Sequence, residues 1–218
     1  MSYSIKSIPD RLFDAERAID NALAYPEILS VLTIYGYDQP NLEAARTVCV
    51  RARELTNVQK KEYGDQYEAT ETVQKAWDEA ATAYSTALKV ARVAFKGQKG
   101  AREALGLGGK RKKSLSGWID QADRFYDNTL SRPEYVTAMS AYSYDQLKLE
   151  AEYALVKVVE AASKAQDHER GEAQEATLAR DAVLDELDAW MADYKSIAEV
   201  AFADDSQKLE QLGWVVPV

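Results

Sequence analysis

The sequence contains an internal repeat with an offset of 107 residues. Residues 21–95 align without a gap on residues 128–202, and 23 of the 75 paired residues are identical. The identical residues include the run Tyr-x-Tyr-Asp-Gln, which occurs at residues 35–39 and again at residues 142–146. Unrelated chains of average composition would share about one residue in fifteen. The repeat therefore predicts two copies of one structural unit, joined in tandem.

Both copies show the periodicity of amphipathic helices. Apolar residues recur at intervals of three or four, and the alternation typical of strands is absent. Prolines and capping acids divide each copy into shorter helices and two long ones. We expect the long helices at residues 39–62 and 66–96 in the first copy, and at residues 146–169 and 173–203 in the second.

A glycine marks the predicted boundary between the two long helices of each copy. Gly64 and Gly171 occupy equivalent positions in stretches that are almost entirely polar. Because glycine readily adopts the left-handed conformation of a turn, we favour an exposed hairpin tip at each position. The alternative is one unbroken helix, in which each glycine would cost about 1 kcal/mol.

These patterns predict an all-α fold, a tandem duplication of a helical unit. Long antiparallel helical hairpins would form a bundle, with the shorter helices at its base. We expect helical repeat 1 at residues 1–107, a basic linker rich in Gly and Lys at residues 108–114, and helical repeat 2 at residues 115–218. The composition of the linker predicts that it is mobile. One bundle and two separate domains both remain open.

One stripe of the last long helix differs between the copies. Trp190 and Tyr194 in the second copy are replaced by Ala83 and Ala87 in the first. We expect Trp190 to lie in the core. The alanine-rich stripe would let another helix approach closely and fill the space that the large rings occupy in the other copy.

Charge is distributed unevenly along the chain. Residues 1–113 carry 18 Lys and Arg against 15 Asp and Glu, whereas residues 114–218 carry 9 against 21. Phosphates repel an acidic surface, so a nucleic-acid partner is not expected there. The asymmetry could instead bring repeat 1 of one molecule onto repeat 2 of another.

No stretch approaches the roughly eighteen apolar residues that a membrane-spanning helix needs. The first residues also lack the apolar segment of a secretory signal. We therefore expect no membrane association and a cytoplasmic location.

The sequence offers no recognisable set of catalytic groups. Cys49 pairs with Val156 in the repeat alignment, which is typical of a small core residue, and His168 pairs with Lys61, which is typical of the surface. A di-iron bundle would need histidines on two helices, and the chain has one histidine. We expect no catalytic residues, no metal and no cofactor, and hence no enzyme.

Two groups of residues could form binding sites. The first is the repeated run, where aromatic rings at a helix junction could contact a ligand or a partner; the alternative is that the acids cap helices and the tyrosines bury their rings. It consists of Tyr35, Tyr37, Asp38 and Gln39, and of Tyr142, Tyr144, Asp145 and Gln146. The second is the basic linker, whose cations could bind a polyanion. Its members are Lys110, Arg111, Lys112 and Lys113.

For function we predict a non-catalytic helical interaction or scaffold protein that can self-associate, with a protein or a second copy of itself as partner. A ligand-binding bundle, with a pocket at the tyrosine junctions or along the alanine-rich stripe, is the alternative. Polyanion binding through residues 110–113 is the third possibility.

Overall fold

The computed structural model describes residues 6–214, and these form eight α-helices and no strand. The prediction of an all-α fold is therefore confirmed. The helices run in the order α1 (Ile8–Ala24), α2 (Pro26–Ile34), α3 (Gln39–Ala94), α4 (Lys99–Ala104), α5 (Leu115–Leu130), α6 (Pro133–Ser140), α7 (Gln146–Ala201) and α8 (Ser206–Gln211). None of the described helices combines the length and the hydrophobicity needed to cross a membrane.

The two longest helices, α3 and α7, have 56 residues each and continue through Gly64 and Gly171. The predicted hairpin tips at these glycines are therefore wrong, and the unbroken alternative is correct. Both glycines are helical, and a Cβ atom at either position would meet nothing within 4 Å. A cost of about 1 kcal/mol for each glycine is small against the continuous hydrogen-bond ladder of so long a helix, whose flanking Glu, Gln and Lys residues favour it.

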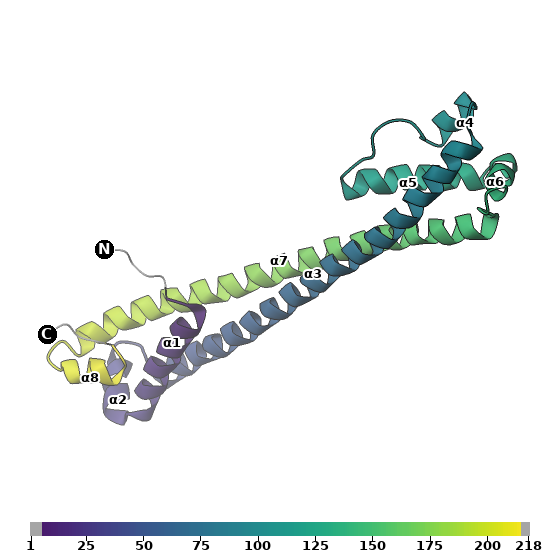
Figure 1. The fold of residues 1–218 in the computed structure, drawn as a ribbon. Helices are drawn as coiled ribbons and strands as arrows, with labels where there is room; N and C mark the ends of the chain where they lie inside the picture. Colours follow the sequence, from purple (N-terminus) through teal and green to yellow (C-terminus); the bar gives the residue numbers. More distant parts are fainter. Residues whose placement is uncertain (1–5, 215–218) are drawn as a thin grey trace. The chain divides into compact units, whose positions relative to one another are not determined.

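The chain divides into two compact units whose boundaries fall inside α3 and α7. Unit 1 comprises residues 1–63 and 172–218, and unit 2 comprises residues 64–171. In unit 1 the first part of α3 packs against the last part of α7, and in unit 2 the last part of α3 packs against the first part of α7 (Figure 1). In each unit the pair of long helices is therefore formed by α3 and α7. Neither helix turns back on itself to form the expected hairpin.

In unit 1, the short helices α1, α2 and α8 cover the paired ends of α3 and α7. Ser7 caps α1 by accepting a hydrogen bond of 3.3 Å from the backbone of Asp10, and Pro26 begins α2 at a position where proline is tolerated. The core contains buried side chains from all five helices. They include Ile19, Leu32, Leu42, Cys49, Leu187, Tyr194 and Leu209.

In unit 2, α4, α5 and α6 occupy the corresponding places around the other ends of the long helices. Ser114 caps α5, accepting a hydrogen bond of 3.3 Å from the backbone of Gly117. This core is more aromatic than that of unit 1. Its buried side chains include Tyr84, Phe95, Trp118, Phe125, Tyr126, Met139 and Leu149.

The alanine-rich stripe of α3 belongs to the core of unit 2. Ala87 is fully buried there, together with the rings of Phe125 and Tyr126 from α5. The equivalent residues of α1 in unit 1 are Ala18 and Ile19. In unit 1 the large buried side chain at this position comes from α7, whereas in unit 2 the large buried side chains come from α5.

Trp190 lies at the edge of the core of unit 1 and not within it. Its ring packs against Tyr37 and Tyr194, with ring centroids 5.6 Å and 4.9 Å apart, while part of the side chain stays exposed. It also lines a surface cavity of about 220 Å³ between α3 and α7. The expectation that Trp190 lies in the core is corrected accordingly: Trp190 packs against the core, and Tyr194 is the fully buried ring.

Candidate functional site

Tyr35, Tyr37, Asp38 and Gln39 lie at the junction between α2 and α3 in unit 1. Asp38 caps α3, because its Oδ1 accepts a hydrogen bond of 3.0 Å from the backbone of Asn41. After α2 the chain turns at Gly36, which has a left-handed conformation with φ +89°. An L-residue adopts this conformation only with strain. The acid and the glycine together fix the angle between the two helices.

The two tyrosines of this junction have different environments. Tyr37 packs on Trp190 and Tyr194, the latter at a centroid distance of 5.0 Å, and burial followed by the charge of Asp193 raises the pKa of its hydroxyl. Tyr35 stays 44% exposed. The half-buried ring of Tyr37 packs against the core, and the ring of Tyr35 is accessible from outside.

The second copy of the run lies between α6 and α7 in unit 2. Its members are Tyr142, Tyr144, Asp145 and Gln146. Asp145 caps α7 by accepting a hydrogen bond of 2.9 Å from the backbone of Lys148. Tyr144 is buried, whereas its counterpart Tyr37 is half-buried. Tyr142 is exposed, as its counterpart Tyr35 is.

The two glutamines extend their side chains along the long helices. Gln39 donates a hydrogen bond of 2.8 Å to Glu43, and Gln146 donates one of 2.7 Å to Glu150. Such pairs four residues apart support the first turn of a helix. The contacts of both runs are those of structural junctions, with an accessible tyrosine on each.

A partly buried polar cluster distinguishes the core of unit 2. The Tyr126 hydroxyl donates a hydrogen bond of 2.9 Å to Oε2 of Glu152, and Tyr144 interacts with the same carboxyl group. Burial raises the pKa of Glu152, although both hydroxyls oppose the shift, and burial raises the pKa of Tyr144 to about 12. Ile19 and Ala45 occupy the positions of Tyr126 and Glu152 in unit 1.

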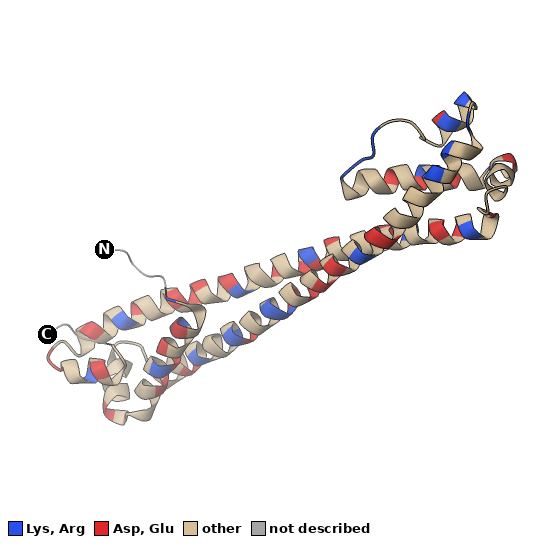
Figure 2. Cartoon of the chain, in the orientation of Figure 1, with Lys and Arg blue, Asp and Glu red and all other residues tan. Residues whose placement is uncertain are grey.

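The most unusual surface of unit 2 is its basic face, which we define as the cations of residues 89–113. This stretch has nine Lys and Arg residues and one carboxylate, Glu103. The cations lie on the last part of α3, on the turn that follows it, on α4 and on the loop before α5, where Figure 2 shows a concentration of blue. They are Lys89, Arg92, Lys96, Lys99, Arg102, Lys110, Arg111, Lys112 and Lys113.

The fold itself does not require these charges. At the nine positions that lie 107 residues away in the other copy, Lys6 is the one cation and Glu199 is a carboxylate. Unit 1 has equivalent helices without this concentration of positive charge. A surface that departs so far from its counterpart is a candidate for a binding role.

The loop that carries the four predicted polyanion residues is tied to the body of unit 2. The Gln121 side chain donates a hydrogen bond of 3.3 Å to the Lys110 carbonyl and accepts one of 3.0 Å from the Lys112 backbone. Between these anchors, Arg111 donates to the Tyr84 hydroxyl at 2.9 Å. The expected mobile linker is thus corrected at its centre, where side-chain hydrogen bonds hold the backbone that composition alone would leave free.

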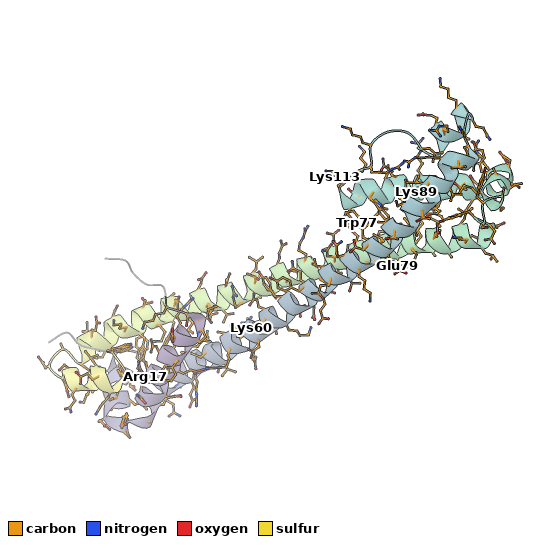
Figure 3. All side chains as sticks on the ribbon, viewed as in Figure 1. Arg17, Lys60, Trp77, Glu79, Lys89 and Lys113 are labelled. Carbon is orange, nitrogen blue, oxygen red and sulfur yellow. The ribbon has the colours of Figure 1, made fainter. Side chains whose placement is uncertain are left out.

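A cleft of about 290 Å³ opens beside this loop, between α5 and the last part of α3. Its floor is apolar, formed by the rings of Tyr84 and Trp118 and the side chains of Leu88 and Ala81. Lys89, Arg92 and Arg111 supply its charged rim, and Ser85 completes the lining. Figure 3 shows Lys89 on α3 and Lys113 on the loop that leads to α5.

Of the residues that form this cleft, the sequence predicted only Arg111. Lys89 and Arg92 are separated along the chain from the four adjacent cations of the linker, so the basic run does not include them. The signal that could have found them is the ratio of nine cations to one carboxylate over residues 89–113. Gln121 had no signal, because its role depends on the approach of the loop to α5.

Comparisons with known proteins give no relative: no family model, no curated protein and no solved structure matches the chain. The functional interpretation therefore depends on the geometry of the two units.

Proposed function

We propose that this chain is a non-catalytic helical interaction protein that associates with copies of itself through complementary charge. The basic face of unit 2 in one molecule would contact an acidic face of unit 1 in the next. We define the acidic face by residues 181–210 on the last part of α7 and on α8, which carry nine carboxylates and two lysines. The observation that supports the proposal most directly is that equivalent elements have opposite charge: α3 and α4 are basic in unit 2, and α7 and α8 are acidic in unit 1.

The carboxylates of the acidic face are largely available to a partner. Asp185, Glu186, Asp193, Asp204 and Glu210 are exposed, and none of them forms an ion pair of 4 Å or less in the part of the chain that the structure describes. Opposite faces of this kind steer association and fix its orientation, and their attraction falls as salt increases.

Such a contact joins different surfaces of the two molecules. A heterologous contact closes into a ring or continues as a filament, depending on the rotation between successive copies. Self-association of this chain would therefore be expected to extend beyond a dimer as the concentration rises.

The duplication proposed here explains why equivalent elements carry the two faces. It is supported by the sequence identity of the copies and by the bounds of the helices, since α7 and α8 begin and end 107 residues after α3 and α4. After duplication, each copy could change its surface charge independently while the core pattern was retained.

The chemistry of the single thiol supports a non-catalytic role. Cys49 is fully buried, and burial, with a smaller contribution from Glu16 and Asp20, raises the pKa of its thiol to about 11. A thiol of this kind is a poor nucleophile near neutral pH, because the thiolate is the reactive form.

A charge-exchange experiment tests the proposal. Lys96→Glu with Lys99→Glu removes attraction on the basic face, and Asp204→Lys with Asp205→Lys removes it on the acidic face. Each variant alone should associate less than the unmodified chain in light scattering at low salt. An equimolar mixture should recover association, because the unmodified basic face of one variant can meet the unmodified acidic face of the other, and the two changed faces are complementary as well. A matched control, Lys60→Glu with Lys75→Glu, makes the same change of charge at exposed positions outside the basic face.

The unmodified chain gives the deciding measurement. We expect its mass to increase between micromolar and hundreds of micromolar concentrations at low salt, and less so at high salt. A constant monomer mass over that range would overturn the proposal, as would association that the control variant weakens as much as the face variants do.

A further inference from the structure

We propose that the cleft between α5 and the last part of α3 binds a small organic phosphate, with Lys89, Arg92 and Arg111 contacting the phosphate group. The apolar body of the ligand would lie on Trp118 and Tyr84. This inference goes beyond self-association, because it concerns one unit of a single molecule and a small ligand.

The charge of the cleft points to an anion. Three of its eight lining residues are cations and none is a carboxylate. Lys89, Arg92 and Arg111 form no ion pair of 4 Å or less with any residue between 6 and 214. Arginine presents paired N–H groups that match the oxygens of a phosphate, and three cations suit a dianion better than a single carboxylate.

Arg111 is held in place before any ligand arrives. Its Nη1 donates to the Tyr84 hydroxyl at 2.9 Å, its Nη2 lies 3.5 Å from the Gly106 carbonyl, and the guanidinium carbon is 5.5 Å from the centre of the Tyr84 ring. Tyr84 in turn donates to the Gln121 carbonyl at 3.2 Å. A guanidinium ordered in this way loses little conformational entropy on binding, and it keeps further N–H groups for a ligand.

The corresponding cleft of unit 1 satisfies its own charges. It lies between α1 and the last part of α7 and is lined by Arg11, Asp14, Arg17 and Asp188, among others. Arg11 pairs with Asp188, while Arg17 pairs with Asp14 at 3.0 Å. The cations of this cleft therefore already have anionic partners inside the fold.

Unit 2 lacks these internal partners. At the equivalent positions Asp188 is replaced by Ala81, and Asp14 is replaced by Gln121. Unit 2 also has Lys89 and Arg92 where unit 1 has Ser196 and Glu199, although Arg11 and Lys195 of unit 1 correspond to Trp118 and Leu88. The pairing that carboxylates provide in unit 1 is left for an external anion in unit 2.

The size and the floor of the cleft indicate the rest of the ligand. A volume of about 290 Å³ lies just below the range of sites for small molecules, roughly 300 to 1,000 Å³, and so indicates a small ligand. Its apolar floor of Trp118, Tyr84 and Leu88 suits a planar or aliphatic group. Phenyl phosphate is therefore a suitable probe, because it combines one dianionic group with one apolar ring.

Isothermal titration calorimetry of the whole chain with phenyl phosphate tests this inference. Saturable binding with one site per chain is expected, and it should weaken at least tenfold in Arg92→Gln and in Arg111→Lys, which keeps the charge but loses the geometry of the fork. Lys195→Gln, a matched loss of one cation in the cleft of unit 1, should bind as the unmodified chain does. Repeating the titration in the Asp204→Lys, Asp205→Lys variant leaves unit 2 unaltered and separates ligand binding from self-association.

Three outcomes would overturn the inference. They are no saturable heat at millimolar phenyl phosphate, equal loss of binding in Lys195→Gln, and unchanged binding in Arg92→Gln. Titrations with phenol and with inorganic phosphate separate the two parts of the ligand, and each should bind more weakly than phenyl phosphate. If single-stranded oligothymidylate binds and phenyl phosphate does not, the basic face binds a polyanionic polymer, and the cleft is not a site for a small molecule.

Discussion

The Tyr126 hydroxyl donates a hydrogen bond of 2.9 Å to Oε2 of Glu152 inside the aromatic core of unit 2. Burial raises the pKa of this carboxyl group above its usual range despite the two tyrosine hydroxyls near it. The folded chain therefore binds the proton of Glu152 more tightly than the unfolded chain does. Stability associated with this group is present at low pH and is lost as the pH rises through the folded-state pKa.

Glu152→Gln should remove this pH dependence. We expect the stability of the variant relative to the unmodified chain to be greater at about pH 7 than at about pH 4, since the glutamine is uncharged at either pH whereas Glu152 ionises as the pH rises. Urea denaturation at both pH values measures the difference. Glu68→Gln at an exposed position of α3 is the control, and a parallel change there would assign the effect elsewhere.

Gly64→Ala and Gly171→Ala should each stabilise the protein by about 0.5–1 kcal/mol, because both glycines lie inside helices and a new Cβ would meet no neighbour. Chemical denaturation monitored by far-ultraviolet circular dichroism checks the prediction. A loss of stability would instead favour a left-handed turn at these positions. Gly36→Ala is a useful contrast, because its φ of +89° makes the same substitution unfavourable.

Arg111→Ser should destabilise unit 2 by about 1 kcal/mol, since the Tyr84 hydroxyl loses the donor that lies 2.9 Å away. Lys112→Ser and Lys113→Ser should change stability by less than about 0.5 kcal/mol, because both side chains are exposed. Thermal and urea unfolding of the three variants compare these effects. Equal effects at all three positions would contradict the anchoring of the loop.

Trp118→Ala and Trp190→Ala should differ in cost. Trp118 is 6% exposed and contacts Tyr84, so its removal should cost about 3–5 kcal/mol. Trp190 lies at the edge of its core, and its removal should cost less than that range. Denaturation by urea ranks the two variants, and a larger effect at Trp190 would place it at the centre of unit 1.

Cys49 should react with a thiol reagent only after unfolding. Its side chain is fully buried and its pKa is raised to about 11 by burial. We expect labelling by dithionitrobenzoate to be negligible in native buffer near neutral pH and complete in concentrated urea. Rapid labelling of the native protein would show that the first part of α3 opens frequently.

Local features of the fold could be predicted from the sequence. Asp38 and Asp145 were expected to cap the long helices, and both accept hydrogen bonds from the backbone three residues later. Prolines were expected to divide each copy into helices, and Pro26 and Pro133 begin α2 and α6. These predictions succeeded because each depends on chemistry within one turn of the chain.

Features that depend on distant parts of the chain could not be predicted in the same way. The polar surroundings of Gly64 fit both a turn and a solvated helix, and only the packing of α3 with α7 distinguishes them. The anchoring of Arg111 depends on Gln121, a residue of α5 that no pattern marks. The candidate cleft was thus visible in the sequence only as an excess of cations.

The division of α3 and α7 between the two units has a consequence for folding during synthesis on the ribosome. Unit 2 is a single continuous segment, residues 64–171, so all its partners are available once that segment has emerged. In unit 1, α1 and α2 pack against the last part of α7 and α8, which are synthesised only after all of unit 2. Because contacts between remote segments form slowly, the apolar side chains of α1 and α2 stay unpaired until the last part of α7 and α8 have also emerged.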